Sequence, residues 1–131
     1  MRVTIEKQQD GTYIAYNKGG QNSYIGTGST LLEARDDFFN TMREAREALA
    51  EAGLPVPSEL TGEVEFKFDV ASLFEYFPML NVSAFARSIG INDGLMRQYR
   101  RGGTYISDAQ LSRIEQGVHA LGKQLSSLRL V

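Results

Sequence analysis

The sequence predicts an α+β protein in which a sheet with one covering helix precedes an all-α domain. Polar and apolar residues alternate with period two in the stretches 2–8, 12–17 and 63–69, as in half-buried strands. Apolar residues recur every three or four positions over 31–51, as on one face of a helix. From residue 69 onward the period is helical throughout. We therefore predict two domains, residues 1–68 and 69–131.

The first two strands are expected to form a hairpin. RVTIEKQ and TYIAYN flank Asp10-Gly11, a dipeptide that tolerates the positive φ angles of a two-residue turn. With such a turn, one face of the hairpin holds Val3, Ile5, Ile14 and Tyr16. The opposite, polar face holds Tyr13, where its ring is available to a partner. A third short strand is expected around SYIGTG, residues 23–28.

A long helix is expected next, because Thr30 and Glu33 have the spacing of a capping box. The helix should begin at Leu31 and bury a stripe formed by Leu31, Ala34, Phe38, Met42, Ala45 and Leu49. Gly53 suits a left-handed helix end, and the prolines at 55 and 57 prevent continuation. EVEFKFD then alternates as a strand. Together these elements form a β-β-β-α-β antiparallel sheet with one covering helix.

The second half is expected to contain helices at 69–77, 82–90, 93–101 and 107–126, and the middle pair has the pattern of a helix-turn-helix. Ala86 is small, as required where two helices cross closely, and Gly90 suits the left-handed position of the turn. Apolar residues expected between these helices are Phe85, Ile89, Ile91, Met96 and Tyr99.

The outward positions of the helix at 93–101 carry side chains that can read DNA bases. Arginine donates two hydrogen bonds to guanine, and glutamine pairs with adenine, in the major groove. Residues near the end of this helix, such as Arg100 and Tyr105, are placed to contact phosphate. The candidate DNA-binding residues are Ser83, Asn92, Asp93, Gly94, Arg97, Gln98, Arg100, Arg101, Thr104 and Tyr105. The alternative is a helical hairpin whose arginines are only solvated.

Composition and charge limit the classes of function. The 131 residues include no cysteine and one histidine, which excludes disulfides, thiolate catalysis and metal sites built on a histidine pair. The net charge of −2 hides a division: twelve acidic and seven basic residues through Asp69, against four acidic and seven basic from Val70 onward. Neither a membrane span nor a secretory signal is evident. We expect a cytoplasmic, non-enzymatic protein without a cofactor, whose basic half binds nucleic acid.

Two family resemblances cover nearly the whole chain. The stretch from FDVASLFEYFPML to SDAQLSRIEQGVHALGKQL resembles a Cro/C1-type, phage-repressor-like helix-turn-helix domain. DGTYIAY, the capped helix in TGSTLLEARDDFFNTMREAREAL and the strand EVEFKFD are similar to HicB-type antitoxins. The HicB resemblance implies a partial RNase H-like N-terminal sheet that blocks a small basic toxin, HicA, which cleaves mRNA. It also implies that the helix-turn-helix represses the operon encoding both proteins.

The resemblance further implies a toxin-binding surface on residues 1–68, for which the candidates are Tyr13, Tyr24, Asp36 and Asp37. The alternative for the two tyrosines is packing in the core, and for the two aspartates it is the solvated side of a helix. A homodimer or tetramer is expected, because a two-fold operator presents half-sites about one helical turn, ~34 Å, apart. Two other hypotheses stay open. One is a stand-alone regulator whose first domain senses a ligand. The other is a degenerate metal-dependent nuclease that uses Glu33, Asp36 and Asp37, although these carboxylates do not share one helix face; no metal ligand or catalytic residue is assigned.

Overall fold

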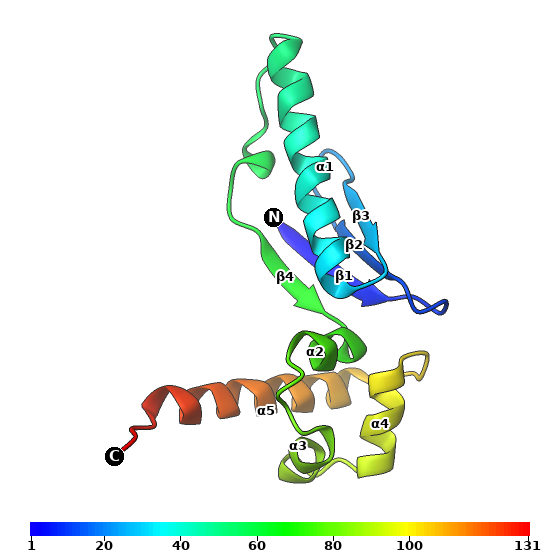
Figure 1. Cartoon of the computed structure of the whole chain (residues 1–131), viewed down its shortest axis with the longest axis vertical. Helices are drawn as coiled ribbons and strands as arrows, with labels where there is room; N and C mark the ends of the chain where they lie inside the picture. Colours follow the sequence, from blue (N-terminus) through cyan, green and yellow to red (C-terminus); the bar gives the residue numbers. More distant parts are fainter. The chain divides into compact units, whose positions relative to one another are not determined.

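The computed structural model describes residues 1–131 and divides them into two compact units, Met1–Pro78 and Met79–Val131 (Figure 1). The first unit contains β1 (Arg2–Lys7), β2 (Tyr13–Asn17), β3 (Ile25–Gly28), α1 (Leu31–Glu51), the 3-10 turn η1 (Ser58–Leu60), β4 (Glu65–Phe68) and α2 (Val70–Tyr76). The second contains α3 (Val82–Ser88), α4 (Asp93–Arg101) and α5 (Asp108–Ser127). The fold is therefore α+β, and none of its helices has the length and apolar character needed to cross a membrane.

The boundary between the two units lies after Pro78, ten residues beyond the boundary predicted at 68/69, because α2 is attached to the sheet. The backbone N–H of Asp69 donates to the carbonyl of Ile5 at 3.2 Å. In return, the backbone N–H of Lys7 donates to Asp69 Oδ2 at 3.1 Å. The rings of Phe68 and Tyr76 stack with centroids 5.1 Å apart. These contacts hold the start and the end of α2 in the first unit.

The sheet is mixed, so the prediction of an antiparallel sheet is wrong at one edge. The strand order is β3-β2-β1-β4, in which β1–β2 and β2–β3 pair antiparallel but β1–β4 pairs parallel. Two antiparallel pairings give β3 the direction of β1. The helix α1 then returns the chain along the sheet, and β4 runs in the direction of β1 once more.

The register of the hairpin also differs from the prediction by one residue. Val3 is opposite Asn17, and Ile5 is opposite Ala15. The loop between the last paired residues has three members, residues 9–11, because Gln8 N–H donates to the carbonyl of Thr12 at 2.7 Å. Only Gly11 takes a positive φ, of 86°, as in a three-residue hairpin loop. A one-residue shift exchanges the two faces of a strand, so β2 turns Tyr13 and Ala15, rather than Ile14 and Tyr16, toward the core.

The core of the first unit lies between this sheet face and α1, which covers it (Figure 1). The predicted stripe of α1 is confirmed for its four buried members, Leu31, Ala34, Phe38 and Met42. The helix begins at Leu31 as predicted, with Thr30 Oγ1 accepting from Glu33 N–H at 3.2 Å. Gly26 allows α1 to approach closely, because a Cβ atom there would collide with the backbone N of Phe38.

The second unit has its own small core. The buried residues of this unit come from α3, α4, α5 and the turn between α3 and α4, and they are Phe85, Ala86, Ile91, Met96, Tyr99 and Ile114. Gly117 allows α5 to approach α3, because a Cβ atom there would collide with Ile89 Cγ2 and lie 3.3 Å from Phe85 Cζ. Most of this core consists of residues predicted to lie between the two middle helices. It therefore fixes which side of α4 faces solvent.

Candidate nucleic-acid interface

The turn between α3 and α4 is built by Ala86 and Gly90. Ala86 is fully buried, and its carbonyl accepts from Ile91 N–H at 2.9 Å, which bends the chain after α3. Gly90 has φ of 73°, a conformation that costs other residues about 1–2 kcal/mol. A Cβ atom at Gly90 would meet nothing within 4 Å. Glycine is therefore required here by the backbone angle rather than by packing.

The start of α4 is capped by Asn92. Its Oδ1 accepts from Gly94 N–H at 2.8 Å and from Leu95 N–H at 3.2 Å. A Cβ atom on Gly94 would lie 3.1 Å from the same oxygen, so glycine leaves room for the cap. Asn92 and Gly94, both predicted to contact DNA, thus have a structural task in positioning the first turn of α4.

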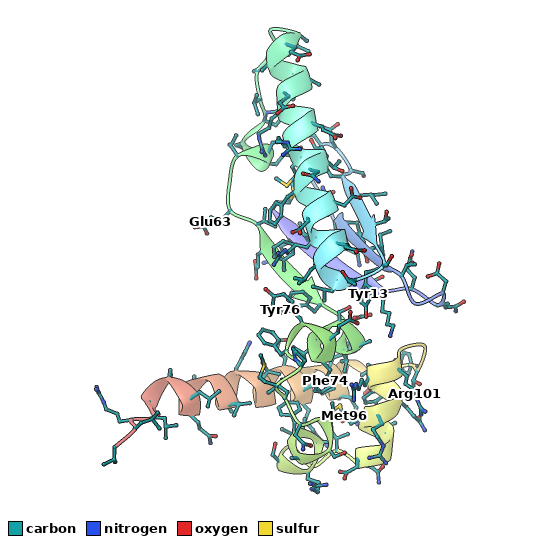
Figure 2. All side chains as sticks on the ribbon, in the orientation of Figure 1. Tyr13, Glu63, Phe74, Tyr76, Met96 and Arg101 are labelled. Carbon is teal, nitrogen blue, oxygen red and sulfur yellow. The ribbon has the colours of Figure 1, made fainter.

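One face of α4 is buried and the other is exposed. Met96 is fully buried and Tyr99 is 5% exposed, whereas Arg97, Gln98 and Arg101 are exposed. Figure 2 shows Met96 on the inner side of α4 and Arg101 on its outer side. Because successive helical residues are separated by about 100°, the three exposed side chains lie on one sector of the helix. The structure thus brings together the predicted base-reading residues.

The arginines on this sector are not neutralised by carboxylates. Arg97 and Arg101 form no ion pair, and the neighbouring Arg100 of α4 forms none either. Arg97 Nη1 donates to Ser83 Oγ at 3.2 Å, which places the predicted residue Ser83 of α3 beside the exposed face of α4. The unit as a whole carries seven basic and three acidic residues. Three of its seven basic side chains are therefore on α4 and free of a carboxylate partner, where they are available to phosphate and to base edges.

Asp93 is the one acidic residue on the predicted surface, and Arg87 neutralises it. Arg87 Nη1 lies 2.6 Å from Asp93 Oδ2 in an ion pair across the turn. Arg87 was absent from the predicted site, because it precedes the turn and its distance from Asp93 depends on how the turn folds. A basic residue on α3 six positions before an acid at the start of α4 is the signal that could have revealed the pair.

The chain leaves α4 through Gly102 and Gly103, which have φ of 82° and 80°. The predicted phosphate-contacting residues Thr104 and Tyr105 follow in this loop, and both are exposed. Tyr105 is 87% exposed, which is unusual for a large aromatic side chain. The loop before α5 therefore presents a hydroxyl and an aromatic ring to solvent.

In the first unit, two of the four candidate toxin-binding residues prove to be core residues. Tyr13 and Tyr24 are 1% and 8% exposed, so a partner cannot reach their side chains. The hairpin register explains Tyr13, and the Asn17 side chain holds Tyr24 by accepting from its backbone N–H at 2.7 Å. Asp36 and Asp37 are exposed. Asp37 also anchors β3, since its Oδ2 accepts from Thr27 N–H at 2.8 Å.

The sheet face opposite α1 holds the residues that replace the two tyrosines as candidates for partner contact. One row across the strands consists of Lys67, Thr4, Tyr16 and Ile25, and Ile25 is 52% exposed. Tyr16 Oη donates to Glu6 Oε1 at 2.7 Å. Burial, followed by this hydrogen bond and by the charge of Glu6, raises the pKa of Tyr16 to about 12. We call Thr4, Glu6, Ile14, Tyr16 and Ile25 the open sheet face.

The carboxylates considered for a nuclease are used separately. Glu33 Oε2 accepts from Ser29 N–H at 2.8 Å, Asp37 binds the amide of Thr27, and Asp36 pairs with Arg35 at 3.2 Å. No group of three or more histidine, cysteine, aspartate or glutamate side chains is arranged to hold a metal ion. The structure assigns Glu33 to helix capping and Asp37 to attachment of β3, whereas Asp36 pairs only with the neighbouring Arg35.

Comparison with known proteins provides no relative from which a function could be transferred. The chain matches no model of a protein family, no curated protein and no solved structure. The features of the chain that bear on function are therefore the exposed face of α4, the open sheet face and the charge of each unit.

Proposed function

We propose that the chain is a DNA-binding repressor of the antitoxin type, with a helix-turn-helix in its second unit and a partner-binding sheet in its first. The observation that carries the proposal is the face of α4. It exposes Arg97, Gln98 and Arg101 without a carboxylate partner, while Met96 and Tyr99 fix the opposite side in the core. Such a helix suits the major groove.

In this mechanism α4 lies in the major groove of the operator. Arg97 or Arg101 donates two hydrogen bonds to guanine, and Gln98 pairs with adenine. Ser83, Arg100, Thr104 and Tyr105 contact phosphates and set the register of α4 on the duplex. The ion pair between Arg87 and Asp93 removes the repulsion that an unpaired aspartate would exert on phosphate. The protein represses by occupying the operator, and in this mechanism its binding to DNA neither makes nor breaks a covalent bond.

The role of the first unit follows from its charge and from the resemblance of its sequence to HicB-type antitoxins. Residues 1–78 carry thirteen acidic and seven basic residues, which suits a basic partner such as a HicA-like ribonuclease. The open sheet face offers Ile14, Tyr16 and Ile25 for apolar contact, next to the carboxylate of Glu6. We propose that this face binds the toxin. Asp36 and Asp37 on α1 are a second candidate position for toxin contact.

One observation favours a different role for the first unit. An open groove of about 450 Å³ lies beside α1 and is lined by Phe39, Met42, Arg46, Leu60, Thr61, Gly62 and Val64. Its volume is in the range of small-molecule sites. The alternative is therefore a stand-alone regulator that binds a ligand there. A metabolite that copurifies with the protein and stabilises it against heat would favour this alternative over the antitoxin.

The DNA-binding proposal is tested with Arg101→Ala and the matched control Arg113→Ala. Arg113 is an exposed arginine of α5 without an ion pair, so both variants lose one positive charge. Binding is measured against the DNA upstream of the gene and against unrelated DNA, over a series of salt concentrations. Arg101→Ala should lose about 10-fold or more in affinity for the upstream DNA. Arg113→Ala should lose much less, and equally on both DNAs.

Two outcomes would contradict the proposal. One is an upstream DNA affinity equal to that for unrelated DNA. The other is an equal loss for Arg101→Ala and Arg113→Ala on both DNAs, which would leave α4 with a general attraction to phosphate and no base readout.

A further inference from the structure

The apolar residues of α5 form a stripe with the spacing of a coiled coil. Steps of three and four residues alternate along it, as in the a and d positions of a heptad. We call this set the α5 stripe: Leu111, Ile114, Val118, Leu121, Leu125 and Leu128. The first five lie within the helix, and Leu128 is its C-cap residue. A stripe with this period is matched by a second helix packed along it.

The second unit itself covers only part of the α5 stripe. Ile114 is 3% exposed, but Leu111 is 41% exposed, Leu125 is 61% exposed and Leu128 is 65% exposed. In Figure 1 the second half of α5, coloured orange to red, extends past α3 and α4. The turns that carry Leu121 and Leu125 thus continue the stripe beyond the helices that bury its beginning.

Two glycines of α5 differ in a way that indicates a missing neighbour. Gly117 has an internal cause, because a Cβ atom there would collide with Ile89. Gly122 has none, since a Cβ atom there would meet nothing within 4 Å. A glycine inside an exposed helix costs about 1 kcal/mol relative to alanine. Gly122 lies three residues before Leu125, on the border of the α5 stripe, where a glycine permits close approach of another backbone.

The charges around the exposed part of the stripe favour a second copy of the chain as the occupant. Between Val118 and Leu128 the only charged residue is Lys123, which the helical period places on the side opposite Leu121 and Leu125. An identical surface can therefore pack against this one without like-charge repulsion. A strongly charged partner would find no complementary group on it.

We propose that α5 pairs with α5 of a second copy through the exposed part of the α5 stripe, about a two-fold axis. Such an interface is self-complementary, because each residue of one copy meets the corresponding set in the other. The exposed part of the stripe, from Leu121 to Leu128, covers only about two helical turns. An interface of this extent is small beside the standard area of ~800 Å² per partner. We therefore expect a dissociation constant on the order of micromolar. The role of the dimer in presenting two α4 helices to two half-sites rests on the proposed function; the pairing itself does not.

The test is the molecular mass of the full-length protein over a concentration series, measured by sedimentation without DNA. The wild type should pass from monomer to dimer between roughly 1 and 200 μM. Leu125→Glu places a charge on the stripe in both copies and should weaken the dimer about 100-fold. The matched control Gln116→Glu adds the same charge on the opposite side of α5, at an exposed residue, and should dimerise like the wild type.

Gly122→Gln provides a second variant that cannot be explained by misfolding. On an unpaired helix this substitution should raise thermal stability, because glutamine is the better helix former. Against a closely packed second helix it should weaken the dimer while the monomer stays at least as stable. A wild type that stays monomeric throughout, or equal dimerisation of Leu125→Glu and Gln116→Glu, would overturn the inference.

The same proteins separate this inference from the proposed function. Dimerisation without preference for the upstream DNA would contradict the repressor and leave the α5 pairing intact. The opposite result is a protein that is monomeric without DNA, binds the upstream DNA preferentially and is unaffected by Leu125→Glu. That result would contradict the α5 pairing and leave the repressor intact.

Discussion

Tyr13 and Tyr16 lie on opposite faces of β2, and their environments determine what each contributes. Tyr13 is 1% exposed, and its hydroxyl has no hydrogen-bond partner, so its ring serves packing. Tyr16 belongs to the open sheet face and donates to Glu6 Oε1 at 2.7 Å. Burial and the nearby carboxylate both favour the neutral phenol, which is why the pKa of Tyr16 rises from 10.0 to about 12.

The raised pKa of Tyr16 predicts a loss of stability in alkali. A folded-state pKa above the unfolded value means that the stabilising contribution is complete below pH 10.0 and disappears as the pH rises toward about 12. Tyr16→Phe should lower the free energy of unfolding at pH 7 by about 1 kcal/mol, through loss of the hydrogen bond. The difference between wild type and variant should shrink as the pH rises above 10.0.

Urea unfolding between pH 7 and pH 11 measures this difference. Tyr105→Phe is the control, because Tyr105 is 87% exposed and should behave like the wild type. A difference between wild type and Tyr16→Phe that grows with pH would contradict the assigned cause.

At the scale of elements, the direction of α4 depends on the turn that precedes it. Gly90 and Gly53 both have positive φ, of 73° and 69°, and a Cβ atom at either would meet nothing within 4 Å. They differ in position, since Gly53 follows the end of α1 and Gly90 joins α3 to α4. The pair therefore separates backbone strain in general from strain that reorients the proposed reading helix.

Gly90→Ala and Gly53→Ala should each destabilise the protein by about 1 kcal/mol, because alanine is strained at positive φ. Only Gly90→Ala should also weaken binding to the upstream DNA, by moving α4 relative to α3. Thermal unfolding and DNA binding of both variants check this. Equal DNA affinity for the two variants would show that the turn does not position the DNA-binding surface.

At the scale of the whole molecule, charge divides the chain more sharply along the observed units than along the predicted domains. The residues through Pro78 carry six more acidic than basic side chains, and those from Met79 carry four more basic than acidic ones. Moving the boundary from 68 to 78 assigns Asp69 and Glu75 to the acidic unit. Each unit therefore suits a partner of opposite charge, a basic protein for the first and DNA for the second.

The proposed partner surface of the first unit predicts the effect of Ile25→Lys. This substitution removes an apolar contact from the open sheet face and adds a charge of the partner's own sign. It should weaken binding of a small basic protein encoded beside the gene by about 10-fold or more. Leu54→Lys is the control, because Leu54 is 56% exposed against 52% for Ile25 but lies in the loop after α1.

Calorimetric titration with that basic protein measures the effect. The upstream DNA affinity of Ile25→Lys should stay equal to that of the wild type, which serves as an internal check on folding. Equal loss of partner binding for Ile25→Lys and Leu54→Lys would place the interface elsewhere on the first unit.

Sequence patterns were sufficient where the determining contacts are local. Thr30 caps α1 by accepting from the backbone N–H of Glu33, three residues away, as the capping-box spacing predicts. The exposed sector of α4 follows from helical spacing once Met96 and Tyr99 are assigned to the core. These features depend on residues within about one turn of each other, so period and capping chemistry predict them.

Only the tertiary structure decided the features that depend on residues distant in the chain or on the folded shape of a turn. The three-residue hairpin loop set the faces of β2, and with them the exchange of Tyr13 for Tyr16 on the open sheet face. The return of the chain through α1 made β4 parallel to β1. The bend at Gly90 brought Arg87 to Asp93. Composition and local period determine which elements form, but pairing and close approach have many alternatives of similar local energy, and only packing of the whole unit selects among them.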